Sequence, residues 1–150
     1  MIISFYKEMN VPELLSKATT LGHVILVTPA VYMEIKGDNF QLLQHAISQD
    51  SIKLCPKISR ERSIEIKSRN PALSNGEIEV IVLGLYLKSK DIDHLCVLDD
   101  KKARKVADGY GLRVIGTIGL LEYYEKEGLI TSTEKEDLIK VLKNSTFRLQ

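Results

Sequence analysis

The sequence is poor in the residues that usually mark redox, zinc or disulfide chemistry. Among 150 residues, cysteine occurs twice and histidine three times; tryptophan is absent altogether. Cys55 and Cys96 stand in separate apolar contexts, without a C-x-x-C pair or a Cys/His spacing. The sequence therefore predicts two buried thiols and no zinc site. His23, His45 and His94 are scattered along the chain, and we interpret them as structural or surface residues.

Long apolar runs and an excess of one charge are also missing. No stretch approaches membrane-spanning length and no charged-then-apolar leader is visible, so we expect a cytoplasmic protein without a membrane partner. Lys and Arg number 21 and Asp and Glu number 20, which gives a net charge of +1. Bulk electrostatics does not indicate a nucleic-acid partner, and any basic surface must be local. The length fits one domain, 1–150, with a real hydrophobic core.

Alternating apolar and helical segments between residues 95 and 121 determine the predicted fold. The run Leu95–Leu98 is typical of a buried strand and ends at Asp99 and Asp100. A basic helical segment follows at Lys101–Asp108, and a second apolar run, Leu112–Ile115, leads into another helix. Strands joined by a helix over so few residues run parallel. We therefore predict an α/β domain with a parallel sheet.

The rest of the chain continues this alternation. His23–Val27 is rich in Val, Ile and Leu, and we predict that it joins the same parallel sheet. Residues 56–70 are charge-rich and poorly periodic, which indicates either a mobile connection with some helix or a basic lip over a site. The other expected strands are Met1–Phe5, Ser51–Cys55 and an edge strand at 147–149. A core-facing helix begins at Ser74 and places Ile78, Ile81, Val82 and Leu85 on one face. The other expected helices run from near Asn10 to Gly22, over Ala30–Lys36 after the cap Thr28-Pro29, over Phe40–Ser48, from the cap Thr117 to Lys126, and from the capping box Thr133–Glu136 to Leu142.

Four acidic residues stand where the predicted elements meet. Glu34 lies in the helix after the His23–Val27 strand, and Glu77 lies in the first turn of a long helix. Asp99 and Asp100 end a strand, which is where open α/β sheets place their chemistry. Carboxylates gathered at such an edge repel each other unless a cation joins them, and oxygen ligands suit Mg²⁺ or Mn²⁺. Such ions can activate water and stabilise the leaving oxygen in phosphodiester cleavage.

Each acidic residue also has a purely structural interpretation. Glu77 follows Ser74 by three residues, so it can complete a capping box, and taken alone this is the favoured interpretation. Asp100 can be a helix N-cap, with Asp99 as its solvated neighbour. Glu34 can be an ordinary exposed helical charge. The prediction of a metal site depends on the group rather than on any one member.

Cations stand in an unfavourable place beside this acidic pair. Lys101 and Lys102 occupy the first turn of a helix, where the macrodipole disfavours positive charge. Together with Arg104 they could hold a nucleic-acid backbone next to a metal. The alternative is a solvated helix face whose cations are neutralised by Asp99 and Asp100.

Several segments together resemble one known family. They are Thr28-Pro-Ala-Val-Tyr-Met-Glu34, Leu73-Ser-Asn-Gly-Glu77, Val97-Leu-Asp-Asp-Lys-Lys-Ala-Arg104, Gly111-Leu-Arg-Val-Ile-Gly-Thr-Ile-Gly-Leu-Leu121 and Glu127-Gly-Leu-Ile130. In these segments the chain resembles the PIN-domain family, in particular its prokaryotic branch related to the toxin ribonucleases of toxin–antitoxin pairs. The resemblance covers nearly the whole chain.

The resemblance implies a fold, an activity and a set of site residues. The fold would be a three-layer α/β/α sandwich with a mostly parallel sheet, and the activity would be RNA cleavage that depends on Mg²⁺ or Mn²⁺. By matching position, Glu34, Glu77 and Asp99 would belong to the acidic metal site. Asp100 would be an auxiliary acid and Thr117 a polar residue near the site. The family further implies a homodimer and an antitoxin partner.

The chain departs from the family pattern at its start. The pattern begins with a strand that ends in an aspartate, whereas Met1-Ile-Ile-Ser-Phe5 resembles the part just after that aspartate. Either the first strand is cut short or the true start of the protein lies upstream of Met1, and for the sequence as given we expect weak or no nuclease activity. A second reading is a degenerate PIN-like domain that binds RNA or a protein partner without cleavage. A third reading, a receiver-like phosphoacceptor at Asp99-Asp100 and Gly116-Thr117, ranks last because receivers carry their paired acids after the first strand.

Overall fold

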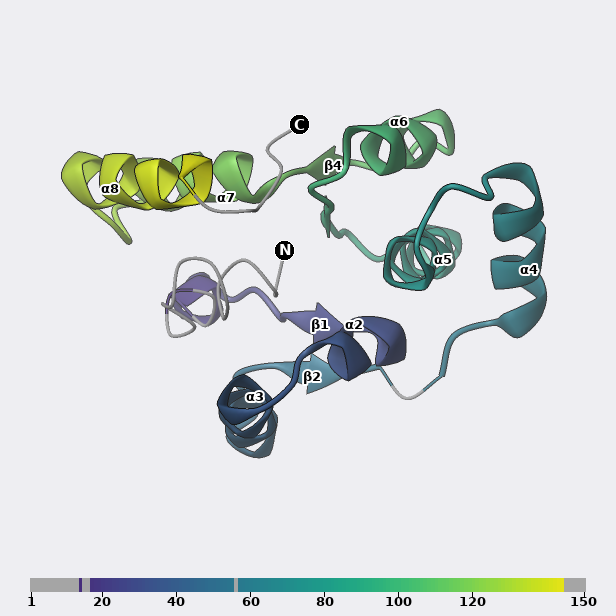
Figure 1. Cartoon of the computed structure of the whole chain (residues 1–150), viewed down its shortest axis with the longest axis horizontal. Coiled ribbons are helices and arrows are strands. Elements are labelled where there is room, and N and C mark those ends of the chain that lie inside the picture. Colours follow the sequence, from purple (N-terminus) through teal and green to yellow (C-terminus); the bar gives the residue numbers. More distant parts are fainter. Residues whose placement is uncertain (1–13, 15–16, 56, 145–150) are drawn as a thin grey trace.

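Helices and short strands alternate along the chain (Figure 1). The computed structural model describes residue 14 and residues 17–55 and 57–144. In chain order the elements are the 3-10 helix η2 (Lys17–Leu21), β1 (Leu26–Val27), α2 (Pro29–Glu34), α3 (Asp38–Ser48), β2 (Lys53–Leu54), α4 (Arg60–Arg69), α5 (Asn75–Ser89), β3 (Cys96–Val97), α6 (Lys101–Gly109), β4 (Val114–Ile115), α7 (Thr117–Lys126) and α8 (Ser132–Lys143). This order confirms the predicted α/β fold class. None of the described helices is both long and apolar enough to cross a membrane.

The strands form two separate parallel pairs. β1 pairs with β2, and β3 pairs with β4, where Cys96 lies opposite Val114 and Val97 opposite Ile115. The predicted parallel arrangement of the strands in 95–98 and 112–115 is therefore confirmed. The prediction that the strand in 23–27 joins them in one sheet is wrong for the described residues. A sheet extends only through an unbroken backbone ladder, and no described strand pairs with both β1 and β3.

Two clusters of buried side chains form the hydrophobic core. One joins the first part of the chain to its last helices, and it contains Leu14, Ala18, Val27, Ile35, Leu43, Ile52, Leu120, Leu121, Tyr124, Ile130 and Leu142. The other surrounds α5 and contains Ile66, Leu73, Ile78, Ile81, Val82, Cys96, Leu98, Ala103, Ala107 and Leu112. Within β4, Val114 packs against the second cluster and its neighbour Ile115 against the first. Because successive strand residues point to opposite faces, β4 carries one core on each side.

Helix α5 is the centre of the second cluster. Ser74 caps its start, and Ile78, Ile81 and Val82 are buried while Leu85 is half-buried, so the predicted core-facing stripe is confirmed. α5 packs against α2, α4, α6 and β3. Figure 1 shows α5 between the two strand pairs and α4, with α7 and α8 at the other end of the molecule. Helix α5 therefore links α2, from the first part of the chain, to α6 and β3.

Three local predictions are corrected by the structure. The sequence predicts a mobile connection with some helix at residues 56–70; the helix is confirmed, but in place of a mobile connection the regular helix α4, capped by Ser59 and anchored by the buried Ile66, fills residues 60–69. The last helix begins at Ser132 and has Thr131 and Glu134 as its capping box. Its N-cap, Thr131, directly follows the buried Ile130. Both threonines satisfy the capping pattern, and the earlier one is used.

The third correction concerns the start of α7. Gly116 is the N-cap and Thr117 is the first helical residue, so the threonine side chain is not the cap. Predictions for the strand at Met1–Phe5, for the first helical residues after Asn10 and for the edge strand at 147–149 lie outside the described residues. The thiol prediction is confirmed for Cys96, which is buried, whereas Cys55 is half-buried.

Candidate functional site

Asp99 is held by Thr117 at the carboxyl end of β3. The backbone N–H of Thr117 donates to Asp99 Oδ1 at 2.7 Å, and the Thr117 hydroxyl donates to Asp99 Oδ2 at 2.9 Å. Thr117 is fully buried and Asp99 half-buried. Gly116 makes room for the Arg104 guanidinium, because a Cβ there would lie only 3.1 Å from Arg104 Nη1, and it would touch Asp99 Oδ1 at 3.4 Å. The first turn of α7 thus orients Asp99.

The neighbours of Asp99 have different tasks. Asp100 is the N-cap of α6, since its Oδ1 accepts the Ala103 N–H at 2.8 Å, which confirms the structural interpretation of this residue. Arg104 turns back toward the strand, where its Nη1 donates to the backbone oxygens of Leu98 at 3.0 Å and Asp99 at 2.5 Å. Its guanidinium therefore tethers α6 to the end of β3.

Of the three cations predicted to bind nucleic acid, Lys101 and Lys102 are exposed and Arg104 is half-buried. The two lysines stand in the first turn of α6, directly after the Asp99–Asp100 pair. Arg104 is engaged with backbone oxygens, so the lysines are the more accessible charges for an external phosphate.

Glu77 closes the capping box of α5 with one of its two oxygens. The Ser74 backbone N–H donates to Glu77 Oε1 at 3.1 Å, and the Glu77 N–H donates to Ser74 Oγ at 3.2 Å. The other oxygen, Oε2, is buried and has no hydrogen-bond partner. An unpaired buried carboxylate oxygen costs stability. Capping alone therefore does not account for this side chain.

Glu34 meets the same turn of α5 from the end of α2. A Cβ on Gly76 would lie 3.0 Å from Glu34 Oε1 and 3.2 Å from Val31 Cγ2, so the missing side chain at Gly76 admits the carboxylate. Glu34 as a whole is exposed, but partial burial of its carboxyl raises its pKa above the ordinary value. The negative charge of Glu77 raises the pKa of Glu34 further. The two carboxylates are therefore close enough to repel each other.

The structure brings two of the three predicted acidic ligands together. Glu34, at the end of α2, lies against the first turn of α5, which contains Glu77. Helix α5 in turn packs against β3, which leads to Asp99. Across the described part of the chain, no three Asp, Glu, His or Cys side chains gather closely enough to hold a metal ion. The convergence of all three acids stays a prediction.

Sequence reasoning missed three contributors to this region. Glu79 accepts the Ala30 N–H at 2.8 Å and so joins α5 to the start of α2. Gly76 provides the space for Glu34, and Gly116 provides the space for the Arg104 guanidinium beside Asp99. A signal existed only for the glycines, which stand directly before the predicted site residues Glu77 and Thr117; nothing in the sequence distinguishes Glu79 from an ordinary helical charge.

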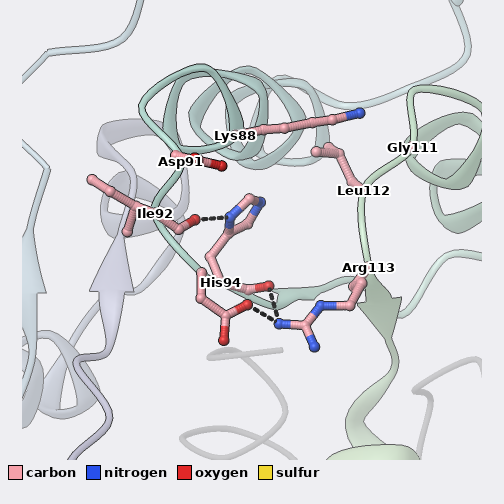
Figure 2. A pocket seen from close by; sticks show the side chains of 8 residues that line it. Lys88, Asp91, Ile92, His94, Gly111, Leu112 and Arg113 are labelled. Atoms are coloured by element: carbon pink, nitrogen blue, oxygen red, sulfur yellow. Dashed lines mark hydrogen bonds and ion pairs between the residues drawn. The ribbon is translucent and has the colours of Figure 1, made fainter.

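A cavity of about 270 Å³ lies at the opposite ends of β3 and β4 (Figure 2). His94 Nδ1 donates there to the backbone oxygen of Ile92 at 2.9 Å, and His94 Nε2 is buried without a partner. Arg113 binds Asp93 and the backbone oxygen of His94, and Lys88 donates to the backbone oxygen of Tyr110. The cavity holds none of the acids of the candidate site, and its cations are bonded within the chain.

The comparison with known families agrees with this arrangement. A sequence model of a family described as PIN domain matches residues 2–150, which is nearly the whole chain. The chain belongs to the PIN-domain family. This PIN domain therefore has a nuclease-type fold, and PIN domains generally depend on a divalent metal. No curated protein matches the chain.

The residues of this PIN domain fit a divalent cation. Glu77 Oε2 is a buried oxygen that lacks a partner, and the neighbouring Glu34 carries a raised pKa because it is partly buried beside a like charge. A hard cation bound by carboxylate oxygens would relieve both costs at once. Hydroxyl and carboxylate oxygens without any nearby thiolate suit Mg²⁺ or Mn²⁺ better than zinc.

Proposed function

We propose that this PIN domain is a Mg²⁺- or Mn²⁺-dependent endoribonuclease whose ion is held by Glu34, Glu77 and Asp99. The observation that supports it is the buried, unpartnered Oε2 of Glu77 beside the carboxyl of Glu34. A capping glutamate needs only one oxygen, so its second oxygen remains for a ligand. Bound there, the cation would supply an activated water and charge stabilisation for phosphodiester cleavage.

The protein's own residues have distinct parts in this proposal. Thr117 holds both oxygens of Asp99 and thereby limits the rotation of that carboxylate. Arg104 fixes the backbone of Leu98 and Asp99 at the end of β3. Such pre-ordering matters because metal-assisted hydrolysis depends on accurate placement of water and phosphate.

The proposed substrate is RNA, bound next to the acids by exposed cations. Lys101 and Lys102 are exposed in the first turn of α6, directly after Asp99 and Asp100. Phosphate contacts by lysine are sequence-independent and weaken with salt. We therefore assign these lysines to backbone binding and leave base preference to other residues.

A second candidate function is RNA or protein binding without cleavage. It is favoured by one observation: among the described residues no three ligand side chains gather as a ready metal site. The two candidates differ in whether Mn²⁺ binds and whether RNA is cut.

Manganese titration separates the two candidates. We expect Mn²⁺ at about 100 times its Kd to stabilise the wild-type chain by about 2.7 kcal/mol, because it binds only the folded state. Glu77→Gln and Asp99→Asn should lose most of this gain and the Mn²⁺-dependent cleavage of a single-stranded RNA. Glu136→Gln, on an exposed position of α8, is the matched control and should behave as wild type.

Equal Mn²⁺ stabilisation of the wild type and both site variants would contradict the proposed ligands. RNA binding by the wild type without Mn²⁺ binding or cleavage would favour the second candidate. Chelation by EDTA should abolish cleavage by the wild type and leave the stability of Asp99→Asn unchanged.

The biological role belongs to the same proposal. We infer a toxin of a toxin–antitoxin pair, located in the cytoplasm, that forms a homodimer and binds an antitoxin protein. The support is the resemblance of residues 74–130 to that branch of the family. Sedimentation of the purified chain tests the dimer, and co-purification with the product of an adjacent gene tests the antitoxin.

A further inference from the structure

The short helix α2 is not capped by its own N-cap residue. Thr28 has the extended backbone of an N-cap, with φ −83° and ψ 157°, but its side chain makes no capping bond. The Thr28 hydroxyl oxygen is buried and has no partner. Pro29 follows at the first helical position and has no N–H. The first backbone donor of α2 is therefore Ala30.

Glu79 of α5 satisfies that donor. Its Oε1 accepts the Ala30 N–H at 2.8 Å, across 49 positions of sequence. In a self-capped helix, the side chain of the N-cap residue accepts a hydrogen bond from the N–H of the second or third helical residue. Here a carboxylate from another helix takes its place, and a negative charge at a helix N-terminus is also electrostatically favourable. Glu79 caps α2 from outside.

The far end of α2 meets the same stretch of α5. Glu34, the last residue of α2, has its Oε1 against the bare Cα of Gly76. Residues 76–79 thus hold α2 at its start through Glu79 and at its end through Gly76, with Glu77 between them. A helix of six residues has little stability of its own, so its position depends on contacts with its neighbours, and these two contacts fix both of its ends.

We propose that Glu79 is a positioning residue that sets Glu34 at its working distance from Glu77 by capping α2 from α5. The proposal rests on the proposed function, in which both carboxylates hold the metal ion. Glu79 is not itself a ligand in this scheme. Its carboxylate acts through the backbone of α2, and what matters is the accepting oxygen rather than the charge.

This distinction can be tested with two substitutions of Glu79. Glu79→Gln keeps an accepting oxygen on a side chain of the same length, whereas Glu79→Ala removes it. We expect Glu79→Ala to lower kcat for Mn²⁺-dependent RNA cleavage about tenfold to a hundredfold with little change in KM, because misplaced groups reduce rate more than binding. Glu79→Gln should restore most of kcat. Glu136→Ala, an exposed glutamate of α8, is the control and should match the wild type.

A second measurement does not depend on catalysis. In the wild type we expect an NMR contact between the side chain of Glu34 and the Hα atoms of Gly76, together with slow exchange of the Ala30 amide. Both should be lost in Glu79→Ala and kept in Glu79→Gln. If the wild type neither binds Mn²⁺ nor cuts RNA, the proposed function fails, and these two signals still decide whether Glu79 positions Glu34.

Two results would overturn the proposal. If Glu79→Ala keeps the Glu34–Gly76 contact, α2 is held by other groups. If Glu79→Gln keeps that contact but loses kcat and Mn²⁺ affinity as fully as Glu79→Ala, the charge acts directly at the metal, and Glu79 is a ligand rather than a positioning residue.

Discussion

Thr117 donates one hydrogen bond to each carboxylate oxygen of Asp99, from its backbone N–H at 2.7 Å and from its hydroxyl at 2.9 Å. Since α7 begins at Thr117, the end of β3 is fastened to the start of the helix that follows β4. Because both carboxylate oxygens are held, this contact orients Asp99. Substitutions of Asp99 can therefore distinguish its contribution to stability from its proposed contribution to metal binding.

Removing the Asp99 carboxylate should cost stability as well as activity. Asp99→Ala leaves the N–H and hydroxyl of the fully buried Thr117 without their acceptor, and we expect a loss of about 1–3 kcal/mol in urea unfolding. Asp99→Asn retains an oxygen for the N–H and an amide for the hydroxyl, so its loss should stay below about 1 kcal/mol. Both variants should lose Mn²⁺ binding. Equal stability of the two would mean that the Thr117 contact contributes little.

Glu77 and Ser74 separate capping from metal binding. Ser74→Ala removes the cap and should destabilise the chain by about 0.5–2 kcal/mol, with Mn²⁺ still bound by the folded fraction. Glu77→Gln keeps an oxygen for the Ser74 N–H and should change stability by less than about 1 kcal/mol while Mn²⁺ affinity falls. Calorimetric titration of both variants below their melting temperatures checks this. Glu77→Gln with full Mn²⁺ affinity would reduce Glu77 to a capping residue.

The stability of the metal-free chain should fall as Glu34 ionises. Partial burial and the Glu77 charge raise the Glu34 pKa in the folded state, so the folded chain binds more protons than the unfolded chain between the two pKa values. Stability then decreases as the pH rises through this window. We expect Glu34→Gln to be modestly more stable than wild type at neutral pH and equal to it in acid, by urea unfolding at a series of pH values. Mn²⁺ at neutral pH should reverse the order.

Gly84 brings α5 close to Cys96 of β3 and to Leu112. A Cβ there would lie 2.8 Å from Cys96 Sγ and 3.0 Å from Leu112 Cδ1. Gly84→Ala should therefore destabilise the chain by about 1–3 kcal/mol through overpacking. Gly109→Ala is the matched control, because nothing lies within 4 Å of its added carbon, and it should be neutral or slightly stabilising. Thermal unfolding of both variants decides; a neutral Gly84→Ala would mean that Cys96 moves easily.

The elements that carry strong local signals could be predicted from sequence. The stripe of α5, its Ser74 cap and the parallel β3–β4 pair all follow from residues within a few positions of each other. The sequence predicts some helix in residues 56–70 but not the full extent of α4, because Ile66 is its one buried residue among many charges. The pairing of β1 was misjudged because strand neighbours in a parallel sheet are set by packing between distant segments rather than by the strand's own sequence.

The candidate site shows the same division. Asp99 and Glu77 were recognised from their places at a strand end and a helix start, and the structure adds the Thr117 bonds and the unpartnered Oε2. The role of Glu79 could not be predicted, because its partner Ala30 belongs to a different helix. The bonds of Arg104 to the backbone of Leu98 and Asp99 could not be predicted either, and RNA binding by Arg104 stays a prediction.

The first hydrophobic cluster has a consequence for the order in which activity can appear during synthesis. Leu43 and Ile52 from the first part of the chain share that cluster with Leu121 and Leu142 from the last helices. A nascent chain that has emerged from the ribosome only as far as α4 carries Glu34 but neither Glu77 nor Asp99. It also lacks the last helices that complete its core. The proposed nuclease activity can therefore appear only after the last helices have emerged and joined this cluster.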